Sequence, residues 1–266
     1  MQRNPHARRI RSTPAALSLA LTAVAVLVVA PAGAAAADPA LEAWRRVLSE
    51  RVEDGGVDYA ALKRDRAGLD LYLRSLAGAR PSEMEKPEAI AFWTNAYNAV
   101  VLHHVLERYP GIESVRDVDG FFDELTFPVA GEELTLDAIE GRGRDLGDPR
   151  VHFAVVCAST SCPDLRGEPY EAGKIDAQLR DQTRRFLSDE SKGLRWEPEK
   201  NTLWLSSIFK WYAGDFTGGS TLLAFFARGG VLDWVVEHAP PAIARKLRGK
   251  DPSVRYMDYD WGLNDR

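Results

Sequence analysis

A long apolar segment between two prolines, Pro87 and Pro110, constrains the fold of this chain more than any other feature. Its apolar residues fall on nearly every face of a helix, so other elements are expected to surround it. Pro87 suits the first turn of a helix, and Pro110 closes the far end. The pattern therefore predicts a central, buried helix over residues 87–109.

Two asparagines interrupt the apolar pattern of this helix. Asn95 and Asn98 stand three residues apart, so their side chains share one face. A buried amide without partners costs about 1–3 kcal/mol, so each amide must find hydrogen bonds. The pair either lines a site or ties the helix to its neighbours, and the second role is commoner for buried polar groups. Trp93, on the same helix, is a candidate ligand contact.

Residues 149–163 contain both cysteines of the chain, Cys157 and Cys162, together with His152. The run 151–157 is rich in β-branched and aromatic residues, which predicts a strand. On a regular strand His152 and Cys157 would point to opposite faces, which argues against a direct His–Cys pair. A partner for His152 is then expected from another element.

Small, polar residues follow this run and predict a tight loop that presents Ser159 and Ser161. Glu140 lies among apolar residues in a short predicted helix that Thr135 begins. Its carboxylate is a candidate to meet His152, although a surface position is the commoner one for a glutamate.

The two cysteines leave several alternatives open. In an exported protein, Cys157 and Cys162 most often form a disulfide, which is the expected state here. A redox-active pair is less expected, because the spacing is not Cys-x-x-Cys. A metal site is not expected, because no second pair of cysteines or histidines supports it. A single nucleophilic cysteine would need both thiols to remain unbridged.

Residues 1–37 have the pattern of a secretory signal peptide. Arginines at the start precede an apolar run over 15–30, and small residues over 34–37 offer cleavage sites. The run is shorter than the roughly 20 residues of a spanning helix, which argues against a lasting membrane anchor. We therefore expect an exported chain, periplasmic or extracellular, whose mature part over 38–266 is one domain.

The chain carries a formal net charge of −5, and the predicted signal peptide removes arginines but no acidic residue. An acidic mature chain argues against nucleic acid as a partner. A small molecule or a peptide is the expected partner, and no cofactor is predicted.

Short-range patterns predict an α+β fold, a single domain with a central helix and flanking helices packed on a mostly antiparallel sheet. Further helices are predicted within 38–79 and over 174–187, 221–228 and 231–247. Strands are predicted over 125–129 and 133–136, as a hairpin over 194–207, and as a closing strand from Val254.

Six motifs occur in order over nearly the whole mature chain: VDY at 57–59, FWTNAYN at 92–98, LDAIE at 136–140, HF at 152–153 with Cys157 and Cys162-Pro163, IFKWY at 208–212, and YDWGLN at 259–264. In these motifs the chain resembles the family called domain of unknown function 547. The resemblance implies export, which is common in bacterial members, and no established activity. Members often have a histidine where this chain has Gly141.

A weaker resemblance is to papain-like and transglutaminase-like folds, where a histidine-bearing strand follows a central helix. Those folds carry a nucleophile at the start of the helix, and this chain has no cysteine there.

Two functional hypotheses follow. The first, preferred because no complete catalytic set can be read from the chain, is a binding module that takes a small molecule, a peptide or a cell-envelope component. Its cleft is lined by Asn95, Asn98, His152 and the 157–163 loop. The second is a hydrolase or acyl-transfer enzyme in which His152 acts as general base, oriented by Asn95, Asn98 or Glu140. Its nucleophile would be Ser159, Ser161 or Cys157. Convergence of these groups on an open pocket would favour the enzyme.

Overall fold

The computed structural model describes residues 38–218 and 228–266, which belong to one compact unit. The predicted signal peptide over 1–37 lies outside the described residues, as does the predicted helix over 221–228 except for its last residue. The described residues form many helices and a few short strands, which confirms the α+β prediction. None of the described helices has the length and apolar character needed to cross a membrane.

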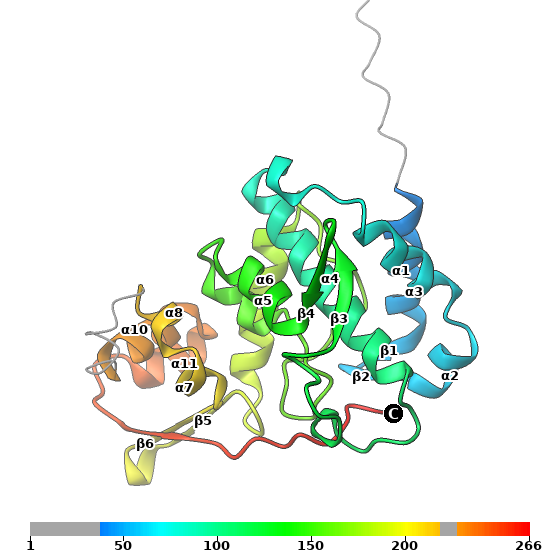
Figure 1. Ribbon diagram of the computed structural model, residues 1–266. Helices are drawn as coiled ribbons and strands as arrows, with labels where there is room; N and C mark the ends of the chain where they lie inside the picture. Colours follow the sequence, from blue (N-terminus) through cyan, green and yellow to red (C-terminus); the bar gives the residue numbers. More distant parts are fainter. Residues whose placement is uncertain (1–37, 219–227) are drawn as a thin grey trace, which may run out of the picture. The chain divides into compact units, whose positions relative to one another are not determined.

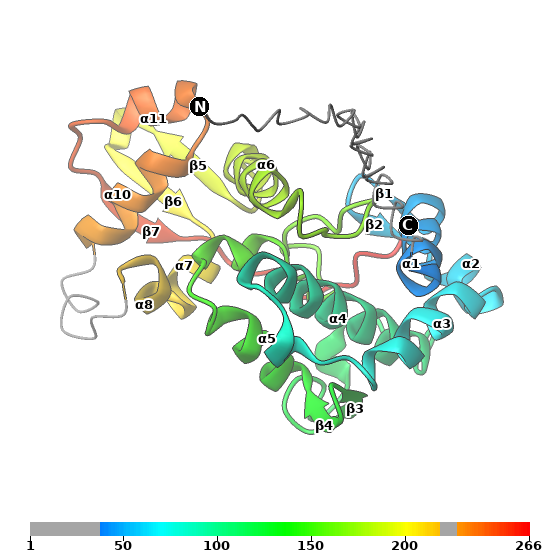
Figure 2. The ribbon, with the colours of Figure 1, turned by 90° about the horizontal axis from the view of Figure 1, so that it is seen from above.

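The central helix is α4 (Lys86–Leu106), and its first turn contains Pro87 as predicted. It ends three residues earlier than the predicted 109, and nearly all of its side chains are buried. Of the described helices, those that pack most extensively against it are α3 (Ala67–Leu76), α5 (Leu136–Arg144) and α6 (Ile175–Ser188). Figure 1 and Figure 2 show α4 enclosed by these neighbours. An apolar sequence on all faces is what such an enclosed helix requires.

Helices before α4 cover one end of it. α1 (Pro39–Arg51) begins where the Asp38 carboxylate accepts a hydrogen bond from the Ala40 backbone N–H at 2.9 Å. α1 packs on α3, and the short α2 (Tyr59–Arg64) links them. Between α1 and α2 the chain forms a two-stranded ladder of β1 (Val52–Glu53) and β2 (Gly56–Val57), with Gly55 in its turn.

The strands form three small sheets. β3 (Thr126–Val129) and β4 (Glu132–Thr135) make an antiparallel hairpin in which Phe127 pairs with Leu134. β5 (Leu194–Glu197) and β6 (Thr202–Leu205) make the second predicted hairpin. The closing strand β7 (Ser253–Tyr256) then pairs in parallel with β6. The pairing is thus mostly antiparallel, as predicted.

The three-stranded sheet has an apolar core of its own. Among the described helices, those that contribute to it are the end of α6 together with α7 (Ile208–Trp211), α8 (Ala213–Phe216), α10 (Arg228–His238) and α11 (Pro241–Leu247). We call residues 149–157 the central segment. Its Phe153 is fully buried in this core and contacts Phe186, Phe209 and Phe216. Residues 149–157 therefore connect the core around α4 with the core around the sheet.

The predicted strand over 151–157 is wrong. Residues Pro149–Phe153 form a 3-10 turn, and residues 155–157 have no regular secondary structure. The Asp148 carboxylate begins the turn by accepting from the Arg150 backbone N–H at 3.1 Å. A buried apolar run does not by itself distinguish a strand from other buried backbone. Here the side chain of Asn98, rather than a neighbouring strand, hydrogen-bonds the backbone of Ala154 and Val156.

The chain ends in a strap, residues 257–266, that runs from β7 back to β2. Figure 1 and Figure 2 show this segment passing beneath the central helices to the C-terminus beside β2. Backbone hydrogen bonds fix it: Thr160 N–H donates to Gly262 O at 2.8 Å, and Asn264 N–H donates to Ala158 O at 3.1 Å. The strap thereby holds Tyr259 and Trp261 beside the loop that contains both cysteines.

Candidate functional site

A cavity of about 350 Å³ opens between α4, α5, α7, the central segment and the strap. We call it the site cavity. The residues that line it are Tyr97, Phe122, Asp123, Asp137, Glu140, His152, Val155, Cys157, Cys162, Ile208, Trp211, Tyr212, Tyr259 and Trp261. His152, Glu140 and Cys157 were predicted as site residues, and the structure brings all three to one cavity. The alternation expected to place His152 and Cys157 on opposite faces does not apply, because the segment is not a strand. The partner of His152 nevertheless comes from another element, as predicted.

His152 is held by a carboxylate from a distant part of the chain. Its Nε2 lies 2.7 Å from Oδ2 of Asp215, on α8. Asp215 is held in turn by Arg144, whose Nε and Nη2 lie 2.8 and 3.3 Å from the carboxylate oxygens. The ring of Tyr212 packs on His152 with 4.1 Å between ring centroids, and the Arg144 guanidinium lies 4.7 Å from the centroid of Tyr212. The imidazole is therefore fixed in both position and tilt.

The protonation states follow from this burial. Burial lowers the pKa of His152 to about 4, more than the Asp215 carboxylate raises it, so the imidazole is neutral near pH 7. Burial also opposes ionisation of Asp215, but the hydrogen bonds from Arg144 and His152 hold its pKa below the ordinary value. A neutral imidazole beside a carboxylate carries its proton on the nitrogen that faces the carboxylate. Nδ1 of His152 is thus the nitrogen left to accept a proton.

Glu140 approaches that free nitrogen. Its Oε1 lies 4.0 Å from His152 Nδ1, which is beyond hydrogen-bond range. Burial raises the pKa of Glu140, although a hydrogen bond with Tyr212 opposes the shift. Glu140 is therefore not a surface carboxylate: its side chain is 10% exposed and belongs to the cavity wall.

Cys157 and Cys162 are both free thiols in the structure, and their Sγ atoms lie 2.7 Å apart. Cys157 is partly exposed, whereas Cys162 is buried. Two further groups reach Cys157 Sγ: the Ser159 hydroxyl at 3.0 Å and the Tyr259 hydroxyl at 3.3 Å. The predicted disulfide is thus absent here, although the two sulfurs are in contact.

The neighbours of Cys157 favour its thiolate. Burial opposes ionisation, but hydrogen bonds from Cys162, Ser159 and Tyr259 to the sulfur lower the pKa of Cys157 below its ordinary value. Burial raises the pKa of Cys162, so that thiol keeps its proton. The thiolate is the nucleophilic form of cysteine, and it develops first on the partly exposed Cys157.

Residues 81–187 match the family described as "Protein of unknown function, DUF547". This part of the chain belongs to that family. No curated protein and no solved structure matches the chain. The DUF547 segment supplies Glu140, His152 and both cysteines, whereas Asp215 and Tyr259 come from beyond it.

Asn98 positions the DUF547 central segment without lining the cavity. Its amide nitrogen donates to Ala154 O at 3.0 Å, and its Oδ1 accepts from Val156 N–H at 2.8 Å. These two bonds hold the backbone on both sides of Val155, between His152 and Cys157. Asn98 is thus a positioning residue, rather than the predicted partner of the imidazole.

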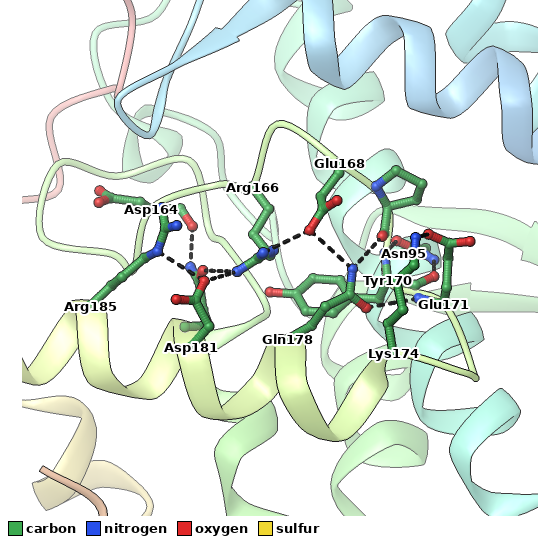
Figure 3. A network of polar contacts seen from close by, with 12 residues as sticks. Asn95, Asp164, Arg166, Glu168, Tyr170, Glu171, Lys174, Gln178, Asp181 and Arg185 are labelled. Carbon is green, nitrogen blue, oxygen red and sulfur yellow. Dashed lines mark hydrogen bonds and ion pairs between the residues drawn. The ribbon is translucent and has the colours of Figure 1, made fainter. Parts of the chain in front are cut away.

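Asn95 serves a network on another side of α4. Its amide donates to Tyr170 O at 2.8 Å, and its Oδ1 accepts from Tyr170 N–H at 2.9 Å. Figure 3 shows this pair beside the contacts of Gln178 and Glu168 with one another and of Glu168 with Arg166. Of the two roles that the sequence allowed, Asn95 therefore has the structural one: it ties α4 to a neighbouring segment.

The other predicted ligand contacts lie around the cavity or away from it. Ser159 is buried, and its hydroxyl oxygen lies 3.0 Å from Cys157 Sγ and 3.3 Å from the Tyr259 hydroxyl oxygen. Ser161 is buried, and its hydroxyl accepts from Asp260 N–H at 2.9 Å. Trp93 lines a different cavity, beside Leu146. Ser159, Ser161 and Trp93 therefore do not line the site cavity, although Ser159 contacts two residues that do.

Two further features of the site concern metal binding and the glycine at position 141. Within residues 38–218 and 228–266, no group of three or more His, Cys, Asp or Glu side chains is placed to hold a metal ion. A Cβ at Gly141 would meet no atom within 4 Å, so the α5 position where family resemblance suggests histidine has room for a side chain. The imidazole in this chain is instead held by Asp215.

Proposed function

We propose that this DUF547 protein is a cysteine-dependent hydrolase or acyl-transfer enzyme that takes a small molecule or a peptide into the site cavity. The observation that supports it most is that Cys157, with its favoured thiolate, and His152, held by Asp215, line one cavity. A nucleophile together with a base that a third group orients is the general pattern of covalent acyl transfer.

The proposed reaction has two steps. Nδ1 of His152 takes the Cys157 proton, and the sulfur forms a bond to the acyl carbon of the substrate. The leaving group departs with the proton that His152 returns to it, which gives a thioester on Cys157. His152 then deprotonates water or an acceptor alcohol or amine, which attacks the thioester carbon. The C–S bond breaks, the acyl group leaves as an acid, ester or amide, and His152 returns the proton to the Cys157 sulfur. Asp215 holds the imidazole and stabilises its cationic form.

Binding without chemistry is a second candidate, and one observation favours it. The sulfurs of Cys157 and Cys162 lie 2.7 Å apart, so oxidation to a disulfide needs little movement. Export to an oxidising compartment, which we also propose for the mature chain, would favour that bond. A bridged Cys157 cannot attack a substrate, and the cavity would then act as a binding site.

The test uses p-nitrophenyl acetate on the mature protein, with and without prior reduction. We expect the reduced protein to form an acetyl thioester on Cys157, detected by peptide mass spectrometry, and to release p-nitrophenol repeatedly. Cys157→Ser should abolish the thioester, whereas Cys162→Ser should retain it. His152→Gln should leave any thioester unhydrolysed.

Absence of a Cys157 thioester in the reduced protein would overturn the enzyme proposal. A bridge in the isolated protein that resists mild reduction would favour the binding candidate. Counting thiols in denaturant, before and after reduction, separates these two results.

A further inference from the structure

The charged side chains that line the site cavity are acidic, although two arginines pack on lining rings: Arg144 on Tyr212 and Arg116 on Trp261. Asp123, Asp137 and Glu140 line the cavity, and its lining includes no Lys or Arg from the described part of the chain. The remaining titratable base, His152, is neutral near pH 7 because burial lowers its pKa to about 4. A cleft whose wall carries charges of one sign concentrates ligands of the opposite sign.

Glu140 has a buried oxygen that lacks a partner. Its side chain is 10% exposed, and Oε1 makes no hydrogen bond within the described structure. His152 Nδ1 stands 4.0 Å away and belongs to a neutral ring. Arg144, the cation that also acts on Glu140, donates its hydrogen bonds to Asp215. An unpartnered buried carboxylate oxygen is unfavourable, and a donor with positive charge would satisfy it best.

Aromatic rings form the rim of the same cavity. The ring centroids of Tyr259 lie 4.9 Å from Trp211 and 4.7 Å from Trp261. Trp211 is 48% exposed, which is unusual for a large apolar side chain and leaves much of it open to a ligand. Aromatic faces attract cations, and the Arg116 guanidinium already lies 5.2 Å from the centroid of Trp261.

We infer that the ligand of the site cavity carries a positive charge, as an amine or a basic side chain attached to an apolar stem. The stem packs on Trp211, Tyr259 and Trp261, and the ammonium group lies among Asp123, Asp137 and Glu140. Asp123 and Asp137 are exposed and attract the cation at the mouth, whereas Glu140 receives it inside. This inference deepens the proposed function, because it specifies the substrate class of the same cavity.

The test compares three soluble probes that differ in one terminal group: N-acetyl-lysine amide, N-acetyl-norleucine amide and N-acetyl-glutamate amide. Their affinities are measured by quenching of tryptophan fluorescence in the reduced full chain. We expect the lysine probe to bind about tenfold more tightly than the norleucine probe, and the glutamate probe to bind most weakly. The preference should weaken as salt is raised.

Variants locate the effect. Glu140→Gln should reduce the preference for lysine over norleucine, and the double variant Asp123→Asn with Asp137→Asn should do so even if Glu140→Gln fails to fold. Glu124→Gln is the matched control, because Glu124 is exposed beside Asp123 and does not line the cavity. The control should keep the full preference.

Equal binding of the lysine and norleucine probes, tighter binding of the glutamate probe, or no binding of any probe would overturn the inference. A lysine preference that Glu140→Gln and the double variant both leave intact would overturn it as well. Failure of the enzyme proposal shows elsewhere, as absence of the Cys157 thioester. A lysine preference without a thioester would support a cationic ligand in a binding protein.

Discussion

His152 Nε2 and Asp215 Oδ2 lie 2.7 Å apart, although 63 residues separate them in the chain. This contact joins the two apolar cores, because His152 belongs to the central segment and Asp215 to a helix that covers the three-stranded sheet. It also selects the nitrogen of His152 that remains free. The placement of the imidazole therefore depends on the packing of the sheet region against the DUF547 segment.

Stability should fall below neutral pH because of His152. Its pKa is about 4 in the folded chain and about 6.5 in an unfolded chain, so the unfolded state binds a proton first as pH falls. The stabilisation is complete above pH 6.5 and is lost between 6.5 and 4. From pH 7 to pH 5 wild type should lose about 2 kcal/mol more than His152→Gln, measured by urea unfolding. Equal losses in the two proteins would contradict the assignment.

The Tyr259 hydroxyl should tune the thiol of Cys157. Tyr259→Phe removes a hydrogen bond of 3.3 Å to the sulfur, so the pKa of Cys157 should rise toward its ordinary value. The rate of alkylation of Cys157 by iodoacetamide at pH 7 should fall about three- to tenfold. Tyr256→Phe, an exposed tyrosine on β7, is the control. If the alkylation rate of Cys157 depends on pH in Tyr259→Phe as it does in wild type, the Tyr259 hydroxyl does not lower the pKa of Cys157.

Replacing either asparagine of α4 should lower the free energy of unfolding, but only the change at Asn98 should also alter the reactivity of Cys157. Asn98→Ala leaves Ala154 O and Val156 N–H without their partner, and Asn95→Ala does the same at Tyr170. Each should cost about 2–4 kcal/mol of unfolding free energy. Asn98→Ala alone should also change the alkylation rate of Cys157, because it frees the backbone between His152 and Cys157. Matching changes of that rate in both variants would count against the positioning role.

Two glycines should respond in opposite ways to alanine. A Cβ at Gly193 would lie 1.7 Å from Phe186 O, so Gly193→Ala should destabilise the chain by about 3 kcal/mol or more. Gly141→Ala meets no atom within 4 Å and favours α5, so it should stabilise by about 0.5–1 kcal/mol. Denaturant unfolding measures both. If Gly193→Ala is stabilised instead, the backbone before β5 does not lie as close to Phe186 O as described.

The sequence predicted elements whose signals are local. α4 was predicted from its prolines and apolar pattern, and α5 from its cap: Thr135 Oγ1 accepts from Ala138 N–H at 3.2 Å. The hairpin over 194–207 was predicted from its turn residues. The segment 151–157 was mistaken for a strand because its buried backbone is satisfied by the Asn98 side chain, a partner that no local pattern reveals.

The site could be predicted only in part, for the same physical reason. His152, Glu140 and Cys157 were chosen by chemistry and proximity to apolar runs, and they do share a cavity. Asp215 was missed because its role depends on a contact across 63 residues. Tyr259 was expected only as part of a closing strand, whereas the strap carries it to a cysteine 102 residues earlier. Both residues do lie in or near the aromatic motifs noted after residue 207, which was the available signal.

The central claim is that Cys157 is a nucleophile and that His152 is its general base. Measuring how fast iodoacetamide alkylates each cysteine of the reduced protein at pH 7 tests this claim most directly. We expect Cys157 to react faster than Cys162, and His152→Gln to slow Cys157 by about tenfold or more. His104→Gln is the control, because His104 is also buried with a pKa of about 4 but does not line the site cavity. Equal rates for Cys157 in wild type and His152→Gln would contradict the account.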